Sequence, residues 1–278
     1  MTLRAELSVT RHLAARWLRE MTQSTVGLAV LVGIKPLVWY VLFGSLFEAV
    51  SSLPAFPAND YRAFILPGVV ALMSLEFVVL GGQCIVDDIR GGMLNKLWTA
   101  PISKTSVVIA RIIMTGTVTI LQVITLLAIA TIDGVRLATG PAGAAVLVAL
   151  AVMLTAGLTA LSMVIAYVLE HQFAFTAVTS FMVLPVVFLS NAFSPPALMP
   201  DWLATIAELN PVSVTITGMR ALVLEGWVGA DLWPAIATVS GFAFIAVVAG
   251  VATFNRPLEP EASLFRALVP GSRRSRST

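Results

Sequence analysis

The sequence predicts an all-α membrane protein with six transmembrane helices, and three observations support that fold class. Hydrophobic residues make up 58% of the 278 residues and charged residues only 12%. The mean hydropathy is +0.93, a composition far from that of soluble domains. Six apolar stretches are long enough to cross a hydrocarbon core of about 30 Å, and most basic residues lie on one side of them.

The six predicted spans cover residues 26–47, 63–86, 105–132, 142–169, 173–193 and 232–254. Only three residues separate the fourth span from the fifth. A single helix covering both would be about 75 Å long at 1.5 Å per residue, so the chain must turn back there. We therefore expect a six-helix transmembrane domain over 26–254, preceded by a segment at 1–25 and followed by a tail at 255–278.

The distribution of lysine and arginine predicts the orientation, because cytoplasmic loops carry an excess of these residues. If both termini are cytoplasmic, twelve of the 17 basic residues lie on that side and three lie outside, with two inside spans. The twelve are Arg4, Arg11, Arg16, Arg19, Arg90, Lys96, Lys104, Arg256, Arg266, Arg273, Arg274 and Arg276. We expect a multi-pass protein of the cell membrane with both ends in the cytoplasm.

Residues 3–21 have the pattern of an amphipathic helix that lies on the membrane surface. Its apolar residues recur at helical spacing, whereas its arginines fall on another face; the apolar set is Leu3, Leu7, Ala14, Trp17, Leu18 and Met21. Two roles remain open for this helix: stabilising entry into the first span, or contacting a partner. The basic tail at 255–278 is expected to serve topology and lipid contact.

Motifs for catalysis and for nucleotide binding are absent from the sequence. It contains no GxxxxGK[ST] phosphate loop, no GxSxG elbow and no HExxH helix. Cys84 is the single cysteine, and His12 and His171 are far apart, so neither a disulfide nor a metal cluster is expected. We expect no enzymatic activity, no metal or cofactor bound by this chain, and no nucleic-acid partner.

The loop after the second span has the pattern of a short docking helix. A glycine pair, Gly91 and Gly92, interrupts the preceding helix, and Pro101 ends the short segment after it. Between them the apolar side chains share one face, with Asn95 and Lys96 opposite; the apolar set is Met93, Leu94, Leu97 and Trp98. Such a helix is suited to a groove on a partner protein.

Three ionisable residues fall inside the predicted spans, where a charge costs at least about 2.5–3.5 kcal/mol. Lys35 lies beside Pro36 in the first span, and Glu76 lies just past the middle of the second. We expect these two to pair; lining a substrate pathway, or proton coupling through Glu76, are the alternatives. Arg111 in the third span is expected to extend its side chain to the cytoplasmic interface.

Three segments of the sequence form a pattern when taken together. The first is Arg90-Gly91-Gly92-Met93-Leu94-Asn95-Lys96-Leu97-Trp98-Thr99-Ala100-Pro101-Ile102-Ser103. The second comprises Ser194-Pro195-Pro196-Ala197-Leu198-Met199-Pro200-Asp201-Trp202-Leu203, Leu209-Asn210-Pro211-Val212 and Met219-Arg220-Ala221-Leu222 before the last span. The third is Phe64-Ile65-Leu66-Pro67-Gly68. Together these segments resemble ABC-2 type transport permeases. The resemblance covers nearly the whole chain in order and is strongest to the drug and antibiotic resistance branch, with lipid exporters beside it.

The resemblance implies a permease that pairs with a second copy or a related permease around a central pathway, in contact with membrane lipids. Separate ATPase subunits would bind ATP and magnesium beneath the pair. Residues 91–98 would transmit closure of the ATPases to the spans, and residues 200–224 would form short re-entrant helices at the outer leaflet. A proton-coupled carrier using Glu76 and a polysaccharide-export permease are the alternatives.

Overall fold

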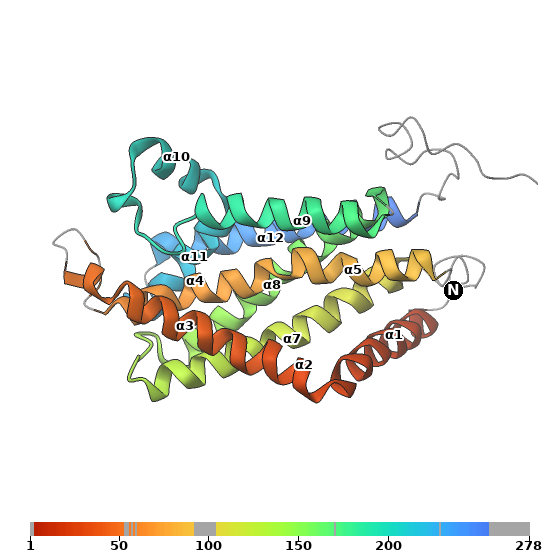
Figure 1. Ribbon diagram of the computed structural model, residues 1–278, viewed down its shortest axis with the longest axis horizontal. Coiled ribbons are helices and arrows are strands. Elements are labelled where there is room, and N and C mark those ends of the chain that lie inside the picture. The colour runs from red at the N-terminus through yellow and green to blue at the C-terminus, as the bar shows by residue number, and fades with distance from the viewer. Residues whose placement is uncertain are drawn as a thin grey trace, which may run out of the picture.

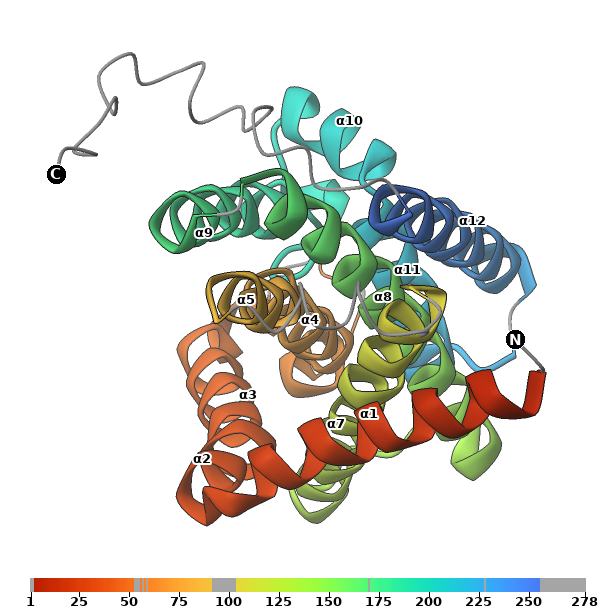
Figure 2. The ribbon, with the colours of Figure 1, turned by 90° about the vertical axis from the view of Figure 1, so that its right-hand side faces the viewer.

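The computed structural model describes residues 3–52, 56, 58, 60–91, 104–169, 171–227 and 229–255. Within these residues all regular secondary structure is helical. Most of the long helices lie roughly lengthwise, side by side, in one bundle (Figure 1). The N-terminal helix α1 instead lies across one end of the bundle (Figure 2).

The helices follow one another in this order: α1 (Leu3–Gln23), α2 (Thr25–Ala29), the π-helix η1 (Val30–Ile34), α3 (Lys35–Leu46), the 3₁₀-helix η2 (Glu48–Ser52), α4 (Tyr61–Leu75), α5 (Phe77–Arg90), α7 (Lys104–Ile132), α8 (Gly140–Leu169), α9 (Gln172–Phe188), the 3₁₀-helix η3 (Pro196–Leu198), α10 (Asp201–Leu209), α11 (Pro211–Leu224) and α12 (Gly229–Phe254).

In the part of the chain that the structure describes, five helical stretches are long and apolar enough to cross a membrane, and they match five of the six predicted spans. They are Thr25–Leu46, Tyr61–Asp87, Lys104–Ile132, Gly140–Leu169 and Asp231–Phe254. The remaining prediction, at 173–193, corresponds to α9, whose 17 residues extend only about 26 Å. This helix ends earlier than predicted, because the chain turns at Leu189 and Ser190, whose N–H groups bond back to Pro185 and Val187.

Helix α8 is the centre of the bundle and packs against α5, α7 and α12. Its contact with α5 is close because Gly81 and Gly82 lie against the backbone and side chains of Thr159 and Ser162. The Ser162 hydroxyl donates a hydrogen bond to the carbonyl of Val78 at 2.5 Å. Small residues at a helix contact let the backbones approach, which is how helices associate where lipid removes the hydrophobic driving force.

The contact between α7 and α8 contains a ladder of threonines. Thr119 donates to the hydroxyl of Thr155, and Thr159 donates to that of Thr115, both at 3.0 Å. All four side chains are buried. Each hydroxyl finds its partner within the bundle, as a polar group away from water must.

The first apolar stretch has a π-turn immediately before Pro36. The N–H of Lys35 reaches back five residues to the carbonyl of Val30, and Pro36 has no N–H to offer to Leu31. The amide of Gln122, on α7, donates to this Leu31 carbonyl at 3.0 Å. Pro36 therefore accounts both for the π-turn and for the hydrogen bond from Gln122 of α7 to Leu31.

Helix α1 begins at Leu3 and extends to Gln23, two residues beyond the predicted 3–21. Ala14 and Trp17 of its apolar face are buried against Val107, Ala110 and Met114 of α7. Two of the predicted apolar residues, Ala14 and Trp17, thus contact the bundle itself.

The turn after α9 lies directly against α4. Tyr61 donates from its hydroxyl to the carbonyl of Phe193 at 2.8 Å. Further along α4, a β-carbon at Gly68 would overlap the backbone of Ala192. The close approach of α4 to the backbone of Ala192 therefore explains why residue 68 is a glycine.

We predict that Gly68→Ala lowers the free energy of unfolding by about 1–3 kcal/mol, because its methyl group meets backbone atoms that cannot rotate away. Thermal unfolding of the purified protein in one detergent measures the change. Gly241→Ala is the matched control, since a β-carbon there meets nothing within 4 Å. Equal unfolding midpoints for the two variants would contradict the close contact.

Candidate functional site: charged side chains inside the helix bundle

Lys35 and Glu76 form an ion pair, as expected from the sequence. Nζ of Lys35 lies 2.7 Å from Oε1 of Glu76. Lys35 is the first residue of α3, after the π-turn, and Glu76 lies at the break between α4 and α5. The predicted second span is therefore interrupted at its acidic residue, where two helical segments meet.

The surroundings of this pair are unusual, because it is only partly covered. The Lys35 side chain is 40% exposed and that of Glu76 is 20% exposed. Neighbouring residues of η1 and α3 are apolar and exposed, including Ile34, Leu37 and Val38. In the most apolar part of Thr25–Leu46 only 11% of the residues are buried. An ion pair in the middle of an apolar helix face must be covered by protein or line a water-filled space.

A second ionic cluster connects α3, α4 and the end of α7. Nη1 of Arg62 lies 2.6 Å from Oδ1 of Asp133, and the Tyr40 hydroxyl donates to Oδ2 of Asp133 at 3.1 Å. Arg62 lies outside the spans predicted from the sequence, and no contact was predicted for it. The available signal was that Arg62 and Asp133 flank apolar stretches on the same predicted side of the membrane.

The segment predicted to form short outer helices consists of α10 and α11. Pro200 precedes α10, and Trp202 within it is exposed. The Asn210 side chain accepts from the N–H of Val212 and so caps α11, with Pro211 in its first turn. The Asn210 amide also donates to the carbonyls of Val186 and Leu189 at the end of α9. This Asn-Pro pair thus joins three helices.

Arg220 on α11 is buried, with 8% of its surface exposed. Its Nε donates to the carbonyl of Phe64 at 3.3 Å, and its Nη2 donates to the carbonyl of Asn191 at 2.9 Å. The guanidinium carbon lies 3.7 Å from the centroid of the Phe64 ring, a cation–π contact. Arg220 therefore fastens α11 to α4 and to the turn after α9.

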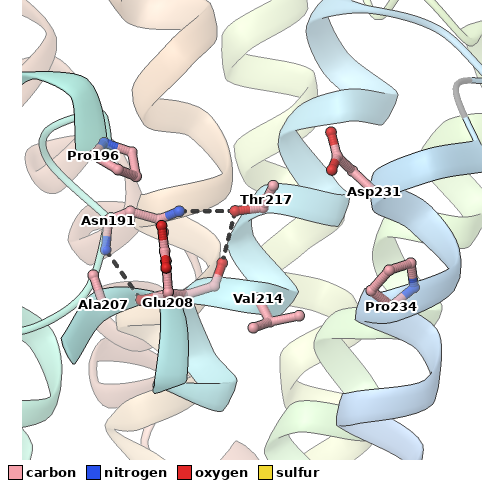
Figure 3. Close-up of a pocket in the computed structure, with 9 residues that line it drawn as sticks. Asn191, Pro196, Ala207, Glu208, Val214, Thr217, Asp231 and Pro234 are labelled. Carbon is pink, nitrogen blue, oxygen red and sulfur yellow. Dashed lines mark hydrogen bonds between the residues drawn. The ribbon is translucent and has the colours of Figure 1, made fainter. Parts of the chain in front are cut away.

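A cavity of about 160 Å³ lies between α10, α11, α12 and this turn (Figure 3). Asn191 and Ser213 are buried polar residues that line it. The Asn191 amide donates to Thr217 at 2.8 Å, and its N–H donates to the Ser213 hydroxyl at 3.2 Å. Glu208 and Asp231 also line the cavity. Neither carboxylate was singled out from the sequence, because the helices that bring them together are separated along the chain.

The predicted ATPase-coupling segment is described only at its start. Arg90 is the last residue of α5, and the N–H of Gly91 bonds to the carbonyl of Asp87 at 2.8 Å. The other predicted residues lie outside the described part of the chain: Gly92, Met93, Leu94, Lys96, Leu97, Trp98 and Pro101. Their role stays a prediction.

The prediction for Arg111 was wrong. We expected its side chain to extend to the interface, but only 2% of the residue is exposed. Its Nε donates to the carbonyl of Gly81, and its Nη2 donates to that of Leu80, both at 3.1 Å. Because α5 offers two backbone carbonyls beside α7, Nε and Nη2 of the guanidinium bond inside the bundle and the side chain does not extend to the surface.

Comparison of the sequence with known protein families gives a match over most of the chain. The family model of ABC-2 type transporters matches residues 9–224. The putative transport permease ycf38 of Porphyra purpurea is 33% identical over 192 residues, which are 67% of this chain and 64% of that protein. The chain thus aligns with slightly less than two thirds of that relative.

Two bacterial relatives are named for drug resistance. The daunorubicin resistance ABC transporter permease protein DrrB1 of Streptomyces coeruleorubidus is 26% identical over 68% of this chain and 66% of its own length. A doxorubicin resistance ABC transporter permease protein, DrrC of Mycobacterium tuberculosis, is 24% identical over 87% of this chain and 84% of its own length. With a family match from α1 to the end of α11, this helical membrane protein belongs to the ABC-2 type transporter family.

Proposed function

We propose that this chain is the membrane-spanning permease subunit of an ATP-binding cassette exporter for an amphipathic drug, antibiotic or lipid-like compound. The observation that carries the proposal is the family match over residues 9–224, which includes α1 and the helical stretches up to the end of α11. The names of the bacterial relatives support the substrate class.

The proposed topology has six crossings with both termini in the cytoplasm of a cell. Five crossings are the long apolar stretches, and α9 is the sixth. The shortness of α9 is compatible with a crossing, because the turn after this helix is covered by α4 and by Asn210. Irregular backbone at membrane depth is tolerated where protein surrounds it.

The proposed pathway lies between two permease chains, on the side that carries Lys35 and Glu76. In Figure 2, α3, α5 and α9 lie along one side of the bundle. The exposed part of the Lys35–Glu76 pair requires a polar or protein cover. A second copy, or a related permease, provides that cover and encloses a pathway.

Energy would come from separate ATPase subunits that bind ATP and magnesium. The sequence contains no phosphate loop, so hydrolysis is assigned to a partner. The partner would dock at the segment from Arg90 to Pro101, using Met93, Leu94, Leu97 and Trp98. Helix α5 leads directly into this segment and carries Gly81 and Gly82 against α8, so a push on it would reach the bundle centre.

The alternative of a proton-coupled carrier rests on Glu76. Its carboxylate is already paired with Lys35 at 2.7 Å, so the ion pair accounts for an acidic residue at this position without a proton relay. Nothing in the described residues favours the polysaccharide alternative over drug or lipid export.

We predict that Lys35→Gln and Glu76→Gln each reduce transport by about a hundredfold, because each leaves one charge unpaired at a cost of about 2.5–3.5 kcal/mol. ATP-dependent uptake of daunorubicin, as the probe, into inside-out vesicles measures the effect. The exchanged pair Lys35→Glu/Glu76→Lys should recover part of the loss. Uptake that needs no ATP, and that Glu76→Gln alone abolishes, would favour the proton-coupled carrier.

We predict that Leu97→Asp releases the ATPase, because it places a charge on the apolar face of the docking helix that the sequence predicts. Asn95→Asp, on the opposite face, is the matched control. Affinity capture of each variant from its native membrane should recover about tenfold less ATPase with Leu97→Asp and an unchanged amount with the control. Equal recovery from the two variants would remove this segment as the docking site.

A further inference from the structure

An apolar cavity of about 310 Å³ lies where α1 crosses α7, next to α5 and η1. Trp17 of α1, Leu31 of η1, and Leu80 and Cys84 of α5 contribute to its wall. Arg111 and Met114 of α7 complete the side beneath α1. The volume is within the range typical of ligand sites, and its wall combines mostly apolar groups with one cation.

Arg111 is the polar feature of this cavity, and part of its guanidinium has no partner. Nε and Nη2 donate to the carbonyls of Gly81 and Leu80 on α5. Nη1 is buried without any hydrogen bond. The planar fork directs Nη1 away from the edge that faces α5. A buried donor of this kind, in a residue that is 2% exposed, requires an acceptor within the cavity, which water or a ligand can supply.

The charges around this donor favour an anion. No carboxylate in the described residues pairs with Arg111. The centroid of the Trp17 indole lies 5.0 Å from the guanidinium carbon of Arg111. Arg111 therefore brings a positive charge to an otherwise largely apolar wall. An apolar cavity with a local positive charge is complementary to an amphiphile with an anionic headgroup.

The position of Arg111 along α7 indicates which class of amphiphile fits the cavity. Arg111 is seven residues from Lys104, where α7 begins, so it lies about 10 Å from that end of the helix. The polar region on each side of a bilayer is about 5–8 Å thick. With Lys104 at the membrane surface, as the sequence predicts, the guanidinium would lie near the depth at which phospholipid phosphates give way to acyl chains. Leu80, 38% exposed, provides an apolar exit for a chain.

We propose that this cavity binds an anionic phospholipid of the surrounding leaflet, with its phosphate on Nη1 of Arg111 and the start of an acyl chain along Leu31 and Leu80. Helix α1 covers the site through Trp17. The lipid joins α1 to α5 and α7. This inference does not depend on the proposed export function, because its tests require neither ATP nor transport.

The single cysteine makes the site measurable in the native sequence. Cys84 lines the cavity and is partly exposed. In nanodiscs of phosphatidylglycerol, N-ethylmaleimide should modify Cys84 several-fold more slowly than in nanodiscs of phosphatidylcholine. Native mass spectrometry should show phosphatidylglycerol retained on the full chain. Arg111→Gln should abolish both effects, whereas Arg136→Gln, an exposed arginine elsewhere, should preserve both.

A second variant keeps the proposal testable if Arg111→Gln does not fold. Leu80→Trp fills the cavity while leaving the guanidinium and its backbone acceptors in place, and it should release the retained lipid. Equal labelling of the wild-type protein in the two lipids would overturn the proposal. So would phosphatidylglycerol that stays bound to Leu80→Trp. Protection that appears only with the ATPase partner and ATP would identify a transported amphiphile and overturn the resident lipid.

Discussion

The constraint on which this structure depends is the need to satisfy backbone carbonyls inside an apolar bundle, where water is not available. Irregular points along the helices leave such carbonyls, and side chains from other helices bond to them. Gln122 bonds to Leu31 at the π-turn before Pro36. Asn210 bonds to Val186 and Leu189 where α9 ends. The buried polar side chains thus hold the helices in register.

The two buried arginines extend the same logic to charged groups. Arg220 and Arg111 each donate to two backbone carbonyls and lie beside an aromatic ring, and neither needs a carboxylate partner. Arg220 uses its contacts to fasten α11 to the rest of the bundle. Arg111 has one nitrogen without a hydrogen bond next to a cavity. The Lys35–Glu76 pair differs from both arginines. Each of its two charges has a partner, but the pair is partly exposed and no other part of the described chain fully covers it.

Much of this arrangement was predictable from the sequence, for reasons visible in particular residues. Hydropathy located the long spans because each must match the bilayer thickness, and the isolation of Lys35 and Glu76 in apolar surroundings predicted their pairing. The end of α9 was misplaced because apolar residues continue past it, at Leu189, Ala192 and Phe193. The burial of Arg111 was missed because it depends on where α5 lies, and composition along one helix does not reveal its neighbours. The cavity at Asn191 was missed for the same reason.

The central claim is that this chain acts as half of a permease pair energised by partner ATPases. Native mass spectrometry of the intact complex, released from its own membrane by mild detergent, tests that claim most directly. We expect a complex of two permease chains, identical or related, with two P-loop ATPase subunits. A chain that is released alone, or in a complex without an ATPase, would contradict the claim.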